Sequence, residues 1–248
     1  MFGFLRKILR SLLPFPWRVR YSRTLGGRCF RDLAGRIGAG GFHAFVARGV
    51  SARRWRHVRI GPDTQVERGT HFHSNDDGDA ARVIIGARCF IGQNCFFSPG
   101  ERILIADDSV IGAACNFLAA GHKYDDAKVA VARAEVMSYG PMVVGAGCWV
   151  GVGTTLLGGI DVGFGAIVAA GSLLRSSVPP LCLAAGHPAR VIRTYDWLDQ
   201  VWTTLPTDEA ARDSALLRHV ERLPSEIDYL KALACENRMD PTTPAVRN

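Results

Sequence analysis

An aliphatic or aromatic residue recurs at every sixth position through the middle of this sequence, and few folds tolerate that spacing. The longest run is Val144, Val150, Leu156, Val162, Val168 and Leu174. The spacing recurs in the triplets Ile60-Val66-Phe72, Ile85-Ile91-Phe97 and Ile105-Ile111-Phe117. A helix would repeat every ~3.6 residues and a half-buried strand every two, so this period indicates short strands joined by corners. It predicts a parallel β-helix whose three-sided coils each take about eighteen residues.

Small residues mark the corners of this predicted helix. A glycine follows the aliphatic residue in Ile85-Gly86, Ile91-Gly92 and Val150-Gly151, and we expect it to supply backbone angles that other residues resist. Cys89, Cys95, Cys115 and Cys148 each lie four residues after an aliphatic position, where the repeat points small side chains inward. We expect these thiols to pack in the core rather than bind metal. The odd total of seven cysteines indicates a reducing, cytoplasmic setting.

The period fails between Phe117 and Val143, where polar and turn-forming residues predominate. Loops of that length in compact domains are usually functional or disordered, and repeats anchor this one at both ends. We therefore predict an all-β domain over residues 60–193, with an extruded loop at 118–143. Residues 1–59 form a basic, partly helical N-terminal segment. Residues 194–248 form a C-terminal helical extension, because capping and acidic residues open an amphipathic run at 207–222.

Positive charge is concentrated at the N-terminus. Residues 1–60 hold fourteen Lys and Arg against one acid, whereas the remainder holds sixteen against twenty-two. Such a basic face attracts anionic membranes, nucleic acids or phosphate-bearing substrates. Residues 1–20 either form an interfacial amphipathic helix or pack on the β-helix. Since no apolar run is long enough for a signal core or a membrane span, we expect a cytoplasmic protein, peripheral at the inner membrane face if residues 1–20 bind lipid.

Three stretches resemble, in order, motifs of the hexapeptide-repeat acyltransferases of the sugar O-acetyltransferase type. They are Ala120-Gly121-His122-Lys123-Tyr124, which opens the loop, Gly145 to Gly151 around Trp149, and Gly171 to Arg193, which ends the repeat. The resemblance covers about residues 83–193. It implies a left-handed β-helix, whereas parallel crossovers are otherwise right-handed. It also implies acetyl-CoA as co-substrate, a sugar acceptor and a homotrimer with active sites between subunits.

The resemblance assigns roles to individual residues. It implies that His122 is the general base, which suits an imidazole titrating near neutral pH, and that Glu135 orients it, ahead of Asp125 and Asp126. Trp149 and Ala170 would line the acetyl-CoA cleft. Arg190 and Arg193, and less strongly Arg175, would bind the phosphates of CoA.

The acceptor is less well defined. Where galactoside-type relatives carry an acceptor-binding Asn, this chain has Gly92, with Asn94 two residues later. The acceptor is therefore expected to differ from theirs. Asn94, Asp125 and Met137 are the substrate-binding candidates.

Three other functions compete with sugar O-acetylation. The same scaffold supports N-acetylation of an amino-sugar nucleotide. A zinc carbonic anhydrase needs three histidines from neighbouring coils, for which His71, His73 and His122 are available, although their surroundings do not resemble that family's. A non-catalytic scaffold that binds membrane or nucleic acid would have no need for His122 in its motif. We expect neither a metal nor a nucleic acid partner.

Overall fold

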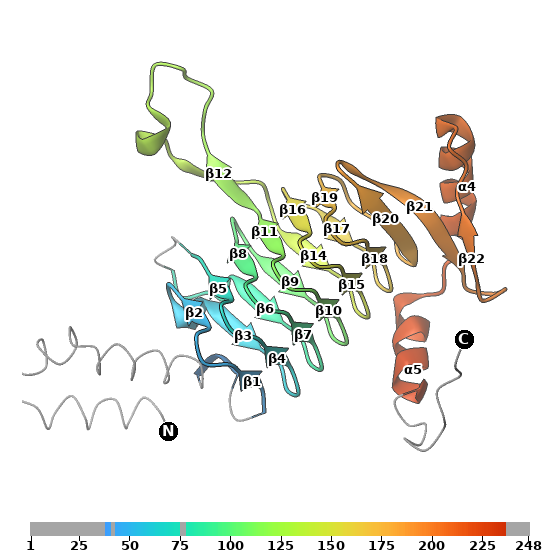
Figure 1. Cartoon of the computed structure of the whole chain (residues 1–248), viewed down its shortest axis with the longest axis horizontal. Coiled ribbons are helices and arrows are strands. Elements are labelled where there is room, and N and C mark those ends of the chain that lie inside the picture. Colours follow the sequence, from blue (N-terminus) through green and yellow to red (C-terminus); the bar gives the residue numbers. More distant parts are fainter. Residues whose placement is uncertain (1–37, 41–42, 75–77, 237–248) are drawn as a thin grey trace, which may run out of the picture.

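The computed structural model describes residues 38–40, 43–74 and 78–236. In this part of the chain the protein is a left-handed parallel β-helix, in which each coil contributes short strands to three sheets, A, B and C (Figure 1). The predicted membrane-binding segment 1–20, and most of the predicted N-terminal segment 1–59, lie outside the described residues. No helix among the described residues is long and apolar enough to cross a membrane.

The strands follow the sides of the coil in sequence order. Sheet A contains, in spatial order, β1 (Phe45–Val46), β4 (Gln65–Val66), β7 (Phe90–Ile91), β10 (Val110–Ile111), β15 (Trp149–Val150), β18 (Ile167–Val168), β20 (Cys182–Gly186), β21 (Ala189–Asp196) and β22 (Val201–Thr204). Sheet B contains β2 (Ser51–Ala52), β5 (His71–Phe72), β8 (Phe96–Ser98), β11 (Asn116–Leu118), β16 (Thr155–Leu157) and β19 (Leu173–Leu174). Sheet C contains β3 (Val58–Ile60), β6 (Val83–Ile85), β9 (Ile103–Ile105), β14 (Met142–Val144) and β17 (Asp161–Val162).

The aliphatic and aromatic residues of the six-residue period all point into the helix. Every one of them is buried, from Ile60 at 6% exposed to Ile91 and Val150 at 0%. Residues of equal phase, that is, those at the same position in successive coils, stack directly on one another. The rings of Phe72, Phe97 and Phe117 therefore form a column with centroid distances of 5.0 and 4.6 Å. The prediction of a β-helix, and of its register, is confirmed.

The glycines after the aliphatic residues have a different purpose from the one predicted. Gly86 and Gly92 do not adopt positive φ; that conformation occurs two residues later, at Arg88 (φ 56°) and Asn94 (φ 59°). Instead, a Cβ added at Gly92 would lie 2.5 Å from the backbone nitrogen of Ala113 in the next coil. Neighbouring coils therefore approach too closely at this position for any side chain.

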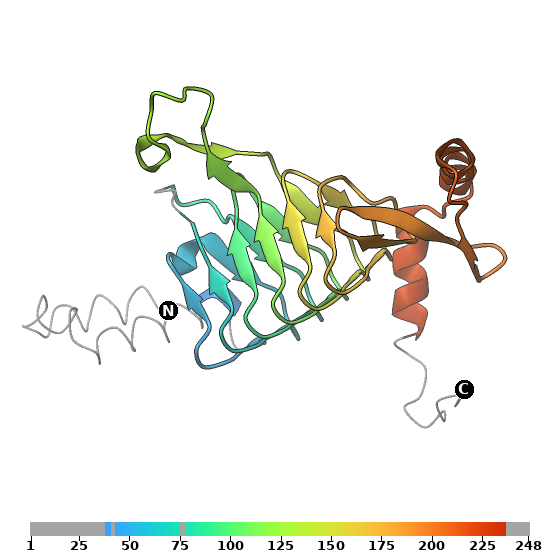
Figure 2. The same ribbon diagram turned by 45° about the horizontal axis from the view of Figure 1, so that its top comes forward.

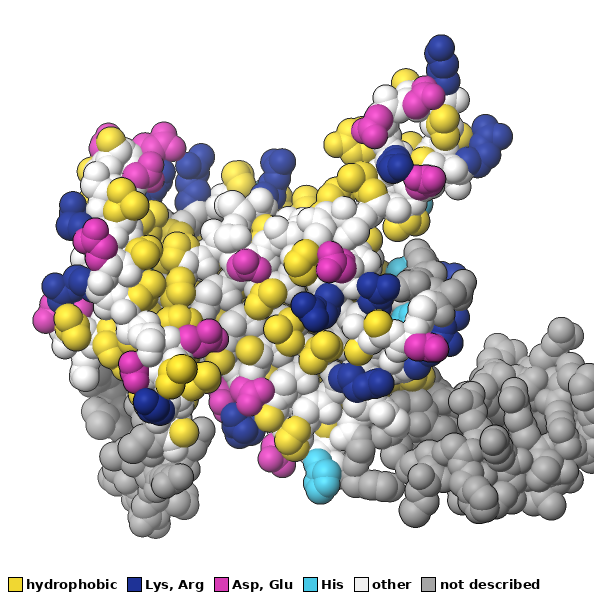
Figure 3. All heavy atoms as spheres, turned by 180° about the vertical axis from the view of Figure 1, so that it is seen from behind, with side chains coloured by type: hydrophobic (Ala, Val, Ile, Leu, Met, Phe, Trp, Pro, Cys, Tyr) yellow, Lys and Arg dark blue, Asp and Glu magenta, His cyan; other side chains and the backbone are white. Residues whose placement is uncertain are grey.

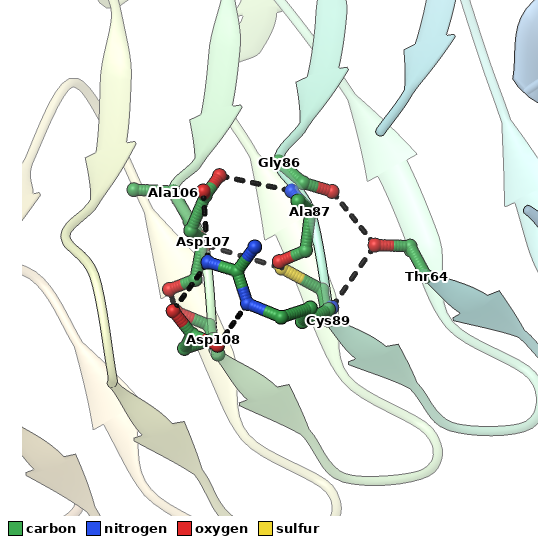
Figure 4. A network of polar contacts seen from close by, with 9 residues as sticks. Thr64, Gly86, Ala87, Cys89, Ala106, Asp107 and Asp108 are labelled. Carbon is green, nitrogen blue, oxygen red and sulfur yellow. Dashed lines mark hydrogen bonds and ion pairs between the residues drawn. The ribbon is translucent and has the colours of Figure 1, made fainter. Parts of the chain in front are cut away.

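Polar and sulfur side chains tie each corner to the next coil. Thr64 donates to the carbonyl of Gly86 at 2.7 Å, and the thiol of Cys89 donates to the carbonyl of Ala106 at 3.2 Å (Figure 4). On the solvent side of this corner, the guanidinium of Arg88 forms an ion pair with Asp108 at 2.7 Å. This ion pair raises the pKa of Arg88. A half-exposed ion pair contributes at most about 1 kcal/mol, so the buried inter-coil bonds matter more.

The β structure extends beyond both predicted boundaries. At the N-terminus the first coil begins at Phe45 rather than at residue 60, and η1 (Trp55–His57) lies between its strands β2 and β3. Its period was hidden because the small residue Ala52 holds the position that Phe72 holds in the next coil. At the C-terminus, residues expected to be helical form the end of β21 and β22. These two strands run antiparallel and close the end of sheet A.

Two helices follow this closing hairpin. They are α4 (Glu209–Glu221) and α5 (Glu226–Glu236), which lie beside the end of the β-helix (Figures 1 and 2). The side chain of Asp208 caps α4 by accepting from the backbone N–H of Ala211 at 2.8 Å, as the sequence predicts for this segment. The ring of Tyr229 on α5 packs against Phe164 with a centroid distance of 4.9 Å, which holds α5 on the helix.

The register of sheet B can be tested on two adjacent leucines of β16. Leu156 is 0% exposed and Leu157 is 36% exposed. We expect Leu156→Ala to lower the free energy of unfolding by about 2–5 kcal/mol through the cavity it leaves, and Leu157→Ala by less than about 1 kcal/mol. Denaturant unfolding at one fixed protein concentration measures both, and equal losses would contradict the register.

Candidate functional site

The predicted extruded loop forms a hairpin at its base. β12 (Ala120–His122) pairs antiparallel with β13 (Val136–Ser138), and η2 (Val131–Arg133) lies between them. The hairpin leaves between β11 of sheet B and β14 of sheet C and stands away from the helix (Figure 2). The ring of Tyr139 lies so close to Gly121 that an added Cβ there would be 2.2 Å from the tyrosine hydroxyl. The tyrosine ring thus covers Gly121 at the base of the hairpin.

His122 ends β12 and is exposed to solvent. It lies opposite Val136 in the antiparallel ladder, and Val136 is itself 52% exposed. The face of the hairpin that carries His122 is therefore open in the single chain. An imidazole in this position is accessible to a substrate.

Glu135 does not lie beside His122. The backbone N–H of Lys123 donates to the carbonyl of Glu135 at 2.9 Å, so these two residues form the next pair of the ladder. Because side chains alternate between faces, Lys123 and Glu135 lie on the face opposite His122. Their side chains form an ion pair, and its hydrogen bond and charge lower the pKa of Glu135. The predicted orientation of His122 by Glu135 is not present in this geometry.

The substrate-binding candidates lie in different places. Asp125 lines a hollow of about 340 Å³ within the loop, with Lys123, Asp126, Val129, Arg133, Ala134 and Glu135 around it. Met137 lies opposite Gly121 on the hairpin and is half-buried. Asn94 occupies the corner between sheets A and B, where its side chain lies over Gly69. Charged side chains of both signs cover the loop, together with hydrophobic ones (Figure 3).

Trp149 belongs to an exposed apolar stripe on the outer face of sheet A. The stripe consists of Phe45 (59% exposed), Phe90 (38%), Val110 (44%) and Trp149 (55%), which hold the same register position in β1, β7, β10 and β15. The polar residue Gln65 of β4 holds this position between Phe45 and Phe90. Of its members, only Trp149 was a candidate from the sequence. The others could have been found, because each immediately precedes an inward aliphatic residue and so must point outward.

Two of the predicted CoA-binding arginines share this outer face. Arg193 lies opposite Leu183, and Arg190 lies opposite Ala185. Leu183 in turn pairs with Ile167, which pairs with Trp149, so the outward side is continuous. A bulge between Leu183 and Ala184 shifts the register of β21. Without it, residues three apart would point to opposite faces, so the bulge brings Arg190 and Arg193 to one side.

The remaining cofactor candidates lie elsewhere. Ala170 is exposed at the corner between sheets A and B, close above Gly151. Arg175 directly follows β19 of sheet B and is exposed. The structure therefore brings Trp149, Arg190 and Arg193 together on one face, but not Arg175.

His122 and Trp149 lie on opposite sides of the single chain. A three-sided helix has one corner opposite each sheet, and the hairpin leaves from the corner between sheets B and C. That corner lies opposite sheet A, which carries Trp149. The two halves of the predicted site can meet only if a second copy of the chain supplies one of them.

The histidines do not form a metal site within the described part of the chain. Among the described residues no group of three or more His, Cys, Asp or Glu side chains could hold a metal ion. His71 and His73 are neighbours on sheet B, with ring centroids 6.0 Å apart, whereas His122 lies on the hairpin. A three-histidine zinc site is not formed by these residues within one chain.

Five cysteines of the β-helix are predicted to be unreactive in the native protein. Cys89, Cys95, Cys115, Cys148 and Cys182 are all at most 2% exposed. Burial raises the pKa of Cys148 and of Cys182 to about 12, and the thiolate is the reactive form. Iodoacetamide at about pH 8 should therefore leave all five unmodified in peptide mass spectra until denaturant is added. Native labelling at the denatured rate would contradict this packing.

Comparison with known proteins supports the repeat and the fold. Residues 82–115 and 141–175 match the family described as "Hexapeptide repeat of succinyl-transferase". "Putative acetyltransferase YJL218W" of Saccharomyces cerevisiae is 27% identical over 124 residues, which cover 50% of this chain and 61% of that protein. "Putative acetyltransferase SACOL2570" of Staphylococcus aureus is 32% identical over 116 residues, which cover 46% and 56%. The chain thus spans little more than half the length of these curated relatives.

A solved structure shares the architecture. It is AntD, an N-acyltransferase from Bacillus cereus in complex with dTDP and 3-hydroxybutyryl-CoA, with a TM-score of 0.53 and 16% identity. The match covers 65% of this chain and 86% of AntD. At this identity the likeness concerns the fold.

Proposed function

We propose that this protein is an acetyl-CoA-dependent O-acetyltransferase that acts on a sugar hydroxyl of a polysaccharide or glycolipid precursor. The observation that carries the proposal is the shared outward face of Trp149, Arg190 and Arg193, three residues that were assigned to acetyl-CoA individually. Similarity to two proteins named as acetyltransferases also supports it.

Acetyl-CoA would bind along the outer face of sheet A. Guanidinium groups suit phosphate because they donate two parallel hydrogen bonds, and those of Arg190 and Arg193 would hold the phosphates of CoA. Arg190 has one carboxylate nearby, Glu209, at 3.9 Å, and Arg193 donates to Thr204 at 3.2 Å. An exposed ion pair of that length contributes at most about 1 kcal/mol, so a phosphate can replace it. The indole of Trp149 would then cover the thioester end.

His122 would act as general base. Its imidazole accepts the proton of the sugar hydroxyl while the hydroxyl oxygen attacks the thioester carbonyl carbon. The carbon–sulfur bond then breaks, and the imidazolium returns the proton to the departing thiolate of CoA. The products are an acetyl ester of the sugar and free CoA, and His122 is neutral again.

The site would be completed between copies of the chain. The hairpin carries exposed apolar residues with no cover in the single chain, including Tyr124 (74%) and Val131 (53%), and the sheet A stripe is a second uncovered apolar surface. A hairpin from one copy docked on the stripe of the next is a heterologous contact, which closes into a ring if the rotation allows. In a homotrimer of this kind, His122 of one copy would meet Trp149 of its neighbour.

A second candidate is N-acetylation of an amino-sugar nucleotide. One observation favours it: AntD, which shares the fold, is an N-acyltransferase whose solved structures include one with dTDP-4-amino-4,6-dideoxyglucose. Both reactions need the same base and the same donor site. Linkage analysis of the acetylated product distinguishes an ester from an amide.

Replacement of His122 tests the proposal. We expect His122→Ala to lower the rate of acceptor-dependent CoA release by about 10²–10⁴-fold, because a positioned base contributes that much. Binding of acetyl-CoA, measured by calorimetry, should stay within about threefold of wild type, since the donor site lies on sheet A. His43→Ala, which removes another exposed histidine, is the matched control. Undiminished turnover in His122→Ala, or wild-type protein that does not bind acetyl-CoA, would contradict the proposal.

A further inference from the structure

A cluster of aromatic and basic side chains lies on the outer face of sheet B. We call Arg53, His71, His73 and Phe96 the histidine patch. They come from the neighbouring strands β2, β5 and β8 (Figure 1), with His71 in register with Ser51 on one side and Phe96 on the other. The alternate residues Phe72 and Phe97 point into the core, so the members of the patch point outward.

The imidazoles of the patch are held in place. The hydroxyl of Ser51 lies 2.8 Å from Nδ1 of His71, which leaves Nε2 of that ring for another partner. The ring of Phe96 stacks on His71 with a centroid distance of 5.8 Å and an interplanar angle of 17°, and it lies 6.0 Å from His73. The two imidazole rings thus lie side by side at half-buried sites, with their centroids 6.0 Å apart.

The surroundings of the patch favour a negative charge. In the described part of the chain, no Asp or Glu occurs among the outward residues of sheet B, which are Ser51, Arg53, His71, His73, Phe96, Ser98, Asn116, Leu118, Thr155, Leu157, Leu173 and Arg175. Arg53 follows β2 next to His73, and its backbone N–H donates to the carbonyl of Phe72. Asp79, in the loop that follows β5, pairs with Arg56 at 3.3 Å. Among the described residues, the outward positions of sheet B therefore carry no acid, and Asp79 is paired with Arg56. Asp76 and Asp77 of the same loop lie outside the described residues.

We propose that the histidine patch binds a phosphoryl group carried by the acceptor, so that the acceptor is a phosphate-linked sugar. This inference rests on the proposed function. A guanidinium and two imidazoles on a sheet face whose described outward residues include no acid supply charge-assisted donors for phosphate oxygens. The patch lies on the sheet from which the hairpin leaves: His73 is two strands, roughly 10 Å, from Leu118, and His122 follows four residues later. An acceptor held by its phosphate on the patch would therefore extend along sheet B toward the hairpin that carries His122.

Protonation of the imidazoles should accompany binding. Burial, and then the charge of His73, lower the pKa of His71, so this ring is mostly neutral at neutral pH. A bound phosphate favours the imidazolium form and raises that pKa. Affinity should consequently increase as the pH falls from about 8 to about 6, and decrease as it rises.

Calorimetry on the full-length protein tests the proposal with UDP-glucose, whose phosphate diesters do not titrate in this range. Farnesyl phosphate, in a separate titration, represents a lipid-linked acceptor, and glucose is the uncharged control. We expect one or both phosphorylated probes to bind and glucose to bind at least about tenfold more weakly. Stronger binding of UDP-glucose supports a sugar nucleotide, and stronger binding of farnesyl phosphate supports a lipid-linked sugar.

Matched variants locate the binding. Arg53→Gln and His73→Asn should each weaken the better probe about tenfold, which corresponds to ~1.4 kcal/mol, whereas Arg59→Gln, on β3 of the same coil but on sheet C, should not. Acetyl-CoA binding, measured on the same samples, reports on the proposed function separately. The proposal is overturned if neither phosphorylated probe binds, or if the patch variants bind it as well as wild type while acetyl-CoA binding is intact.

Discussion

Hydrogen bonds from each coil to the next are the interaction on which this structure depends. Backbone N–H groups of one coil donate to carbonyls of the next, as from Val110 to Cys148 at 2.8 Å and from Trp149 to Ala166 at 3.0 Å. Buried side chains at the corners add to them: Ser109 donates to the carbonyl of Gly145 at 3.0 Å. Buried polar groups must be paired, so all coils are held in one register. Residues of equal phase therefore stack in columns, inside and outside.

This register turns a local sequence pattern into extended surfaces. The inward columns form the core. The outward columns form the sheet A stripe and the histidine patch, each assembled from residues about twenty or more positions apart in sequence. The hairpin with His122 interrupts a single corner, and the coils resume in register after it, since Val144 pairs with Ile105 as though the loop were absent. The proposed general base is thus presented on the β-helix without disturbing the stacking of the coils.

Much of the fold could be predicted from the sequence because the period of six is specific to stacked corners. The prediction failed where that period was hidden. Ala52, in the place that Phe72 holds one coil later, concealed the first coil, and the antiparallel strand β22 showed no six-residue period. The close approach at Gly92 was also unpredicted, because contact between coils depends on residues far away in sequence. That contact explains why this chain cannot carry an acceptor-binding side chain at Gly92.

The site was predicted less completely than the fold. The positions of Trp149, Arg190 and Arg193 on one face depend on strand register and on the bulge in β21, which no motif reveals. Glu135 resembled an orienting acid, yet alternation along the hairpin directs it away from His122 and toward Lys123. Of the histidine patch, only His71 and His73 were noted in the sequence. Arg53 and Phe96 complete the patch, and only the stacking of the coils brings them beside the histidines.

The central claim is that His122 and Trp149 act together from different copies of the chain. Mixed oligomers of His122→Ala and Trp149→Ala test it most directly. The two variants are unfolded, combined in equal amounts and refolded together, and the activity of the mixture is then assayed at low acetyl-CoA. With random mixing, half of the copies supply an intact His122, and half of the neighbouring copies supply an intact Trp149. Both residues are therefore intact in about a quarter of the sites. Activity near a quarter of wild type is predicted. Activity equal to the average of the two variants refolded separately would show that each site is complete within one chain.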